Sequence, residues 1–190
     1  MKTFPVGPFV FLLLSSCITT SEAGESFNQR FKLQGISFHV TCPNNSSINT
    51  VRIVPAGLTI DNSTIVKDVD GTVVGAEIAD INADGSPEIY IYATSAGSGS
   101  YGSLIAYAAN QNKSLSEIYL PAVNDNEKQA KGYMGHDAFA VGEGALLHRF
   151  PIYREGDTNA NPTGGMRQIQ YRLVRGEAGW ILKAYHEIEY

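Results

Sequence analysis

The residues with the clearest capacity for chemistry form one short polar stretch, residues 95–102, which reads Ser-Ala-Gly-Ser-Gly-Ser-Tyr-Gly. Glycine leaves the backbone uncovered for close approach by another molecule, and serine hydroxyls can donate or accept hydrogen bonds. Tyr101 is the only large side chain in the stretch, and it carries both an aromatic surface and a hydroxyl. Because the stretch lies between the strand-like runs 88–94 and 103–109, it predicts an exposed loop that enters a concave surface on another molecule.

The same stretch partly matches two motifs of catalytic and cofactor sites. Gly97, Gly99 and Gly102 have the spacing of the dinucleotide fingerprint, but that motif needs a following helix, and a strand is expected here. A nucleophile elbow needs glycine two residues before its serine, whereas Ser100 follows Ser98 at that distance. Four histidines are scattered without metal-ligand spacing: His39, His136, His148 and His186. We therefore predict a protein that is not an enzyme, with no catalytic residues and no cofactor, and a hydrolase stays as an open alternative.

A second polar cluster lies at residues 80–88, which read Asp-Ile-Asn-Ala-Asp-Gly-Ser-Pro-Glu. Alternating oxygen-bearing side chains before a glycine resemble the first part of a calcium loop, but the glutamate of an EF-hand would fall at Ile91. A shorter loop remains open, and its candidate metal ligands are Asp80, Asn82, Asp84 and Glu88. We favour a hairpin turn in which Asp80 or Asn82 bonds the nearby backbone, and predict no metal.

The elements that position these segments are predicted to be strands. Short apolar or alternating runs are separated by Asp-Gly, Gly-Ser and Asn-Pro pairs, and they cover residues 31–40, 51–54, 73–79, 88–94, 104–109, 145–153, 168–174 and 180–188. Only residues 125–131 have a helical pattern. The sequence therefore predicts a mainly β fold: an antiparallel β-sandwich or barrel-like single domain with at most one short helix.

Residues 1–23 have the features of a signal peptide that is removed on export. Lys2 provides the positive start, residues 4–14 form the apolar core, and small residues precede a cleavage point after Ala23. A second interpretation stays open, because residues 14–17 resemble a lipobox in which Cys17 is lipidated after removal of residues 1–16. Either way the protein is exported, and residues 24–190 form the folded domain; it would contact a membrane only through a lipidated Cys17.

The net charge and the cysteine count limit which partners the protein can bind and whether a disulfide can stabilise its fold. The formal net charge of −5 argues against nucleic acid as a partner, because nucleic acid requires a basic surface. If Cys17 leaves with the signal peptide, Cys42 has no intramolecular partner. We predict that Cys42 is a reduced, buried thiol, and a homodimer is left open.

Several segments together resemble the periplasmic inhibitors of invertebrate-type (I-type) lysozyme from Gram-negative bacteria. They are residues 80–85, 95–102, 131–137 and 149–164. The resemblance extends over roughly residues 73–183, whereas the chain before about residue 62 carries no matching motif.

This resemblance implies a β-rich periplasmic domain whose protruding loop enters the substrate cleft of an I-type lysozyme, as a means of evading host defence. The family's Ser-x-x-Tyr pair falls on Ser98 and Tyr101, where Ser98 would bond a catalytic carboxylate and Tyr101 would pack in the cleft. The implied lysozyme-binding loop consists of Ser95, Gly97, Ser98, Gly99, Ser100, Tyr101 and Gly102. Tyr133 and His136 are candidate secondary contacts. An exported calcium-binding or sugar-binding adhesion module is the alternative from another functional class.

Overall fold

The computed structural model describes residues 24–142 and 144–190. The predicted signal peptide, including Cys17, lies outside the described residues. Within these residues, helical structure is confined to one 3-10 turn and one four-residue α-helix beside it. No helix in this part of the chain has the length and apolar character needed to cross a membrane.

The first eight strands lead to the short helical segment, and four more strands follow it. The elements are β1 Phe27–Leu33, β2 Ile36–Cys42, β3 Ile48–Ala56, β4 Ile65–Asp70, β5 Thr72–Ala79, β6 Glu88–Thr94, β7 Gly102–Asn110, β8 Ser114–Tyr119, η1 Val123–Asp125, α1 Glu127–Ala130, β9 Ala138–Gly142, β10 Ala145–Pro151, β11 Met166–Arg175 and β12 Trp180–Glu189.

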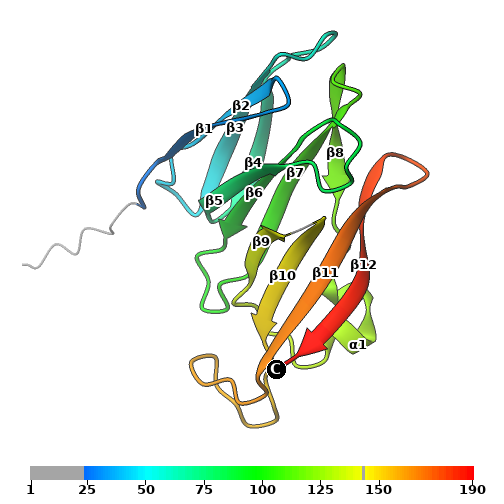
Figure 1. Ribbon diagram of the computed structural model, residues 1–190. Helices are drawn as coiled ribbons and strands as arrows, with labels where there is room; N and C mark the ends of the chain where they lie inside the picture. The colour runs from blue at the N-terminus through cyan, green and yellow to red at the C-terminus, as the bar shows by residue number, and fades with distance from the viewer. Residues whose placement is uncertain (1–23, 143) are drawn as a thin grey trace, which may run out of the picture.

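The strands form two sheets (Figure 1). One has the order β1-β2-β3-β4, and the other has the order β5-β6-β7-β8-β12-β11-β10-β9. All neighbouring pairs are antiparallel except β8 and β12, which pair in parallel over only two positions, Trp180 with Ile118 and Ile181 with Tyr119. The mainly β, sandwich-like and barrel-like prediction is confirmed, with this one parallel contact as its exception.

Strand β6 is the centre of the molecule because both of its faces are buried. Successive side chains of a strand point to opposite faces. Ile89 and Ile91 therefore pack in one core with residues of β2 and β3, while Tyr90 and Tyr92 pack in a second core with residues of β10 to β12. Cys42 is free and 2% exposed in the first core, so its predicted burial is confirmed.

The eight-stranded sheet curls until its two edge strands approach each other. Glu77 of β5 accepts a hydrogen bond from the backbone N–H of Val141 in β9, at 2.9 Å. The same carboxylate oxygen accepts the hydroxyl of Tyr92, at 2.6 Å. These bonds join β5 to β9 and bring residues 137–141 close to the strands that lead into and out of the loop 95–101.

The structure differs from the sequence prediction at the N-terminal end and at three short strands. The run 31–40 is two strands rather than one, because Gln34 and Gly35 both have positive φ and form a tight turn between β1 and β2. Strand β3 continues through Pro55, where a missing N–H is tolerated because its pairing with β4 ends at Ile53. Strands β4, β8 and β9 were not predicted.

Candidate functional site

The loop between β6 and β7, residues 95–101, is fixed by its own hydrogen bonds. The N–H of Ser95 donates to the carbonyl of Tyr101 at 2.9 Å, and the N–H of Tyr101 donates to the Ser95 hydroxyl oxygen at 3.1 Å. A tight turn inside the loop joins the N–H of Ser100 to the carbonyl of Gly97 at 2.9 Å. The predicted loop residue Ser95 therefore holds the base of the loop.

The two residues expected to form the Ser-x-x-Tyr pair are exposed on this loop. Tyr101 is 48% exposed, and Ser98 is also exposed. The Ser98 hydroxyl oxygen accepts a long hydrogen bond, 3.4 Å, from the side-chain amide of Asn159. Because Ser98 is the acceptor in that bond, its own hydroxyl hydrogen can still be donated to another molecule.

Close packing explains one glycine of the loop and the glycine that begins β7. A methyl group added at Gly99 would lie 2.5 Å from the ring of Tyr101, and one added at Gly102 would lie 2.6 Å from the Asp137 side chain. Gly97 has no atom within 4 Å of the same position. Gly99 and Gly102 therefore allow the loop to lie against its support, whereas Gly97 faces open space.

Asp137 anchors the loop from below, and sequence reasoning did not single it out. Its side chain is fully buried, and one carboxylate oxygen accepts the N–H of Gly102 at 2.7 Å and the hydroxyl of Tyr133 at 2.8 Å. The other oxygen is 2.6 Å from Nε2 of His148. The segment 131–137 was noticed only through the family resemblance, because burial of a carboxylate cannot be read from the sequence.

The two candidate secondary contacts both support the loop, in different ways. The hydroxyl of Tyr133 donates a hydrogen bond to Asp137, and its ring forms a T-shaped pair with the ring of Tyr101, with 5.8 Å between the ring centroids. Burial, followed by the charge of Asp137, raises the pKa of Tyr133 far above its ordinary value. The backbone N–H of His136 donates to the carbonyl of Gly99 at 2.7 Å. Both residues therefore lie directly beneath the loop.

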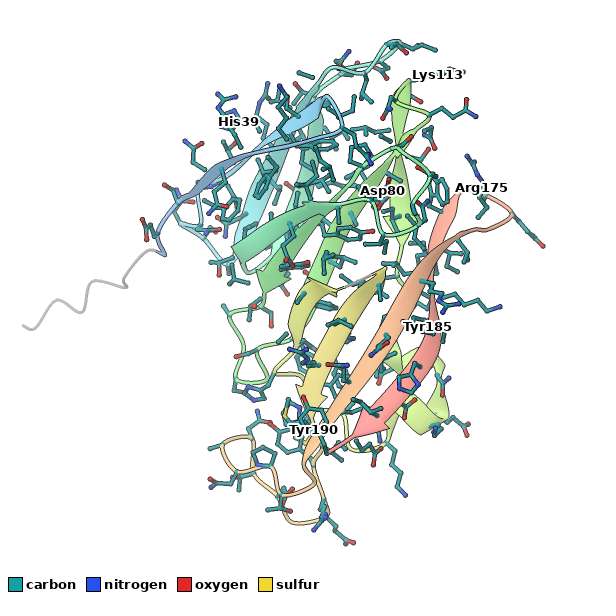
Figure 2. All side chains as sticks on the ribbon, in the orientation of Figure 1. His39, Asp80, Lys113, Arg175, Tyr185 and Tyr190 are labelled. Carbon is teal, nitrogen blue, oxygen red and sulfur yellow. The ribbon has the colours of Figure 1, made fainter. Side chains whose placement is uncertain are left out.

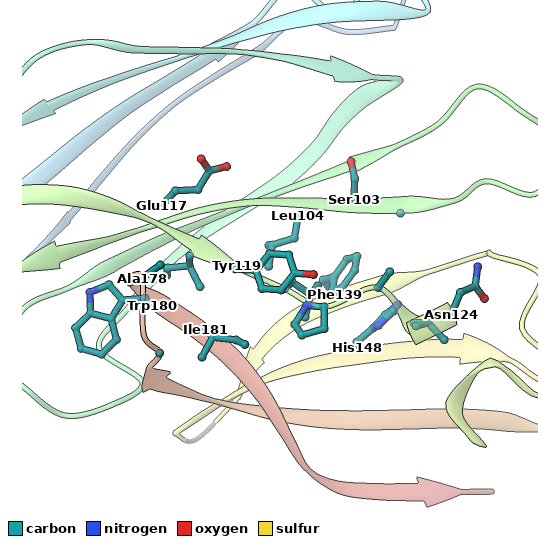
Figure 3. Close-up of a pocket in the computed structure, with 18 of the residues that line it drawn as sticks. Ser103, Leu104, Glu117, Tyr119, Asn124, Phe139, His148, Ala178, Trp180 and Ile181 are labelled. Atoms are coloured by element: carbon teal, nitrogen blue, oxygen red, sulfur yellow. The ribbon is translucent and has the colours of Figure 1, made fainter. Parts of the chain in front are cut away.

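A cleft of about 880 Å³ lies beside the loop, where β8 and β12 make their short contact. Phe139 and His148 lie next to each other in its wall (Figure 3). Their ring centroids are 4.3 Å apart. The Asp137–His148 pair resembles part of a catalytic triad, which also needs a nucleophile bonded to the histidine. Nδ1 of His148 is buried and has no hydrogen-bond partner in the described part of the chain. Asp137 and His148 are instead arranged to hold the loop in place, because Asp137 also accepts the N–H of Gly102.

The Asp-rich turn lies at the opposite end of β6 from the loop. Asp80 accepts the N–H groups of Asp84 and Gly85 at 3.0 and 2.9 Å, and Asn82 accepts that of Asp84 at 3.2 Å. The predicted bonding of this turn to its own backbone is confirmed. Carboxylate oxygens of Asp80, Asp84 and Glu88 also lie within 4.8 Å of one another.

Comparison with known proteins confirms the family resemblance over the centre of the chain. Residues 58–146 match PliI, the family described as periplasmic lysozyme inhibitor of I-type lysozyme. The match contains the turn 80–88, the loop 95–101 and the anchor Asp137, but it ends before the segment 149–164. Searches of curated proteins and of solved structures gave no match.

Proposed function

Because residues 58–146 match a family of periplasmic inhibitors of I-type lysozyme, we propose that this protein inhibits such a lysozyme and has no catalytic activity of its own. The loop 95–101 enters the substrate cleft of the enzyme. The observation that carries the proposal is an exposed serine and tyrosine on a loop that Asp137 and the segment 133–136 hold in place. A pre-ordered loop loses little conformational entropy on binding, which favours affinity.

The chemistry of a lysozyme cleft suits these two side chains. The cleft of such a glycosidase contains two carboxyl groups, one an acid and the other ionised. The free hydroxyl hydrogen of Ser98 donates to one of them, and hydrogen bonds to a charged acceptor are stronger than neutral ones. Tyr101 supplies rigid aromatic surface at the centre of the contact, as interface anchors commonly do.

The proposal also accounts for the charge and the export signals. A net charge of −5 increases the rate of encounter with a cationic lysozyme. Removal of residues 1–23 would release the domain into the periplasm, whereas lipidation of Cys17 would attach it to a membrane. The mass of the mature protein extracted from whole cells with detergent distinguishes the two, because the lipoprotein form begins at an acylated Cys17 and carries the mass of its lipid.

The experiment is inhibition of an I-type lysozyme by the Ser98→Ala and Tyr101→Ala variants. Truncation of a central aromatic anchor costs about 2 kcal/mol or more, which is roughly a thirtyfold loss of affinity. Loss of a hydroxyl that bonds a charged partner costs about 1.5–3 kcal/mol, roughly ten- to a hundredfold. The control is Tyr185→Ala, which removes another exposed tyrosine, 43% exposed on β12 (Figure 2).

Both loop variants should keep the melting temperature of the parent, because Ser98 and Tyr101 lie on the exposed side of the loop. The Tyr185→Ala control should inhibit as the parent does. If both loop variants inhibit as strongly as the parent, the loop does not enter the cleft. A fall in melting temperature without loss of inhibition in Tyr101→Ala would show that its ring serves the fold instead.

A further inference from the structure

Glu88, the first residue of β6, is a buried carboxylate with an unsatisfied oxygen. The residue is 1% exposed. Its Oε2 accepts the N–H of Ile81 at 2.9 Å and the hydroxyl of Tyr90 at 3.4 Å. Its Oε1 has no hydrogen-bond partner within the described ranges 24–142 and 144–190. A buried acceptor without a partner costs about 1–3 kcal/mol, and more when it is charged.

Two further carboxylates face the same point. Oxygens of Asp80, Asp84 and Glu88 all lie within 4.8 Å of one another. Among the described residues, the ion pairs within 4.0 Å include none of these three acids. Burial, and then the charges of Asp80 and Asp84, raise the pKa of Glu88 to about 8. Three acids are therefore held together without a basic side chain to balance them.

The surroundings keep this arrangement in place and leave one side open. Gln34, in the turn between β1 and β2, donates its side-chain amide to Asp80 at 2.7 Å. The exposed Asp84 gives the cluster access to solvent. Figure 2 labels Asp80 in the turn that joins β5 to β6. An ion could thus reach the buried Glu88 past Asp84 without movement of the sheet.

We propose that the turn 80–88 binds one Ca²⁺ ion through carboxylate oxygens of Asp80, Asp84 and Glu88. Ca²⁺ takes oxygen ligands at about 2.3–2.6 Å, so two ligand oxygens of one ion lie at most about 5 Å apart. The three carboxylates satisfy that limit, and all are hard oxygen donors. The ion supplies the missing partner of the buried oxygen and offsets two of the three carboxylate charges.

Such an ion stabilises the hairpin β5–β6 and takes no direct part in the proposed inhibition. The turn lies before Glu88 at one end of β6, and the loop 95–101 follows Thr94 at the other end. Calcium should therefore change the stability of the folded protein, while folded protein inhibits equally with or without it. The calcium site and the lysozyme-binding loop can thus be tested separately.

The test is a calcium titration of protein stripped with a chelator, followed by calorimetry and thermal unfolding, with Mg²⁺ in a parallel series. We expect one Ca²⁺ per chain. At a calcium concentration one hundred times the dissociation constant, the melting temperature should rise by about 5–10 °C. The Asp84→Asn and Glu88→Gln variants should bind at least tenfold more weakly. The matched control, Asp61→Asn, changes an exposed turn aspartate that accepts the N–H of Ser63, and should respond as the parent does.

The Asp84→Asn and Glu88→Gln variants distinguish loss of calcium binding from loss of folding. Glu88→Gln places a neutral amide among the acids and should melt at or above the parent in chelator, which shows that it folds. The proposal is overturned if the parent shows neither a calcium-dependent heat nor a shift in melting temperature. It is equally overturned if Mg²⁺ alone binds, or if both variants respond to calcium as the parent does.

Discussion

Replacement of Asp137 by alanine should destabilise the protein more than any truncation on the exposed loop. The change removes a buried acceptor from the N–H of Gly102 and the hydroxyl of Tyr133, and it also leaves His148 without its carboxylate partner. Each donor left buried and unpaired costs about 1–3 kcal/mol. Two such donors give a loss of about 2–6 kcal/mol in the free energy of unfolding. In a domain of this size, 1 kcal/mol shifts the melting temperature by about 2–4 °C, so the fall should be at least about 4 °C.

Thermal unfolding followed by circular dichroism measures this loss directly. Asp61→Ala is the control, because that exposed carboxylate accepts a single N–H, from Ser63, and should change stability by less than about 1 kcal/mol. Asp137→Asn keeps one acceptor oxygen and should fall between the parent and Asp137→Ala. If the free energy of unfolding of Asp137→Ala lies within about 1 kcal/mol of the parent's, which is half of the smallest loss expected above, then Asp137 does not anchor the loop.

Three other outcomes follow from the same geometry. Gly99→Ala should displace the ring of Tyr101 and weaken lysozyme inhibition at least about tenfold. Gly97→Ala should keep the melting temperature of the parent, because a methyl group there meets no other atom of this protein within 4 Å. Cys42 is free and buried, so mass spectrometry without reductant should give a monomer; a dimer linked through Cys42 would contradict this. Hydrogen bonds from two backbone N–H groups lower the pKa of Asp157 below 3.8. These bonds therefore hold the loop around Asp157 while its carboxylate is ionised, and they are lost as the pH falls through the lowered pKa. Titration of its carboxyl by NMR should give a value below 3.8, and an ordinary or raised pKa would show that the bonds are not formed.

The strands with strong apolar or alternating patterns could be predicted from the sequence, whereas the weak ones could not. The run Glu88–Thr94 is buried on both faces, so its isoleucines and tyrosines give a continuous apolar signal. Strand β4, in contrast, has one buried residue and reads Ile-Val-Lys-Asp-Val-Asp, so its pairing with β3 is what defines it. The parallel contact between β8 and β12 depends on how the chain returns after α1, and no local pattern encodes that return.

The candidate loop was recognisable because its composition is unusual, but its support was not. Ser98 and Tyr101 stand out as polar and aromatic residues among glycines. Asp137 is one aspartate among many until the fold buries it against Gly102. The sequence likewise places Glu88 next to a turn but does not show that it is buried. Its burial beside Asp80 and Asp84 is what makes it a candidate calcium ligand.

A lysis assay measures directly whether this protein inhibits an I-type lysozyme. The purified protein is mixed with invertebrate-type, chicken-type or goose-type lysozyme, and the clearing of a bacterial cell suspension is followed. We expect the I-type enzyme to be inhibited near equimolar ratio, and Tyr101→Ala to need roughly thirtyfold more protein for the same effect. Undiminished lysis by the I-type enzyme in molar excess of the folded parent protein would contradict this expectation.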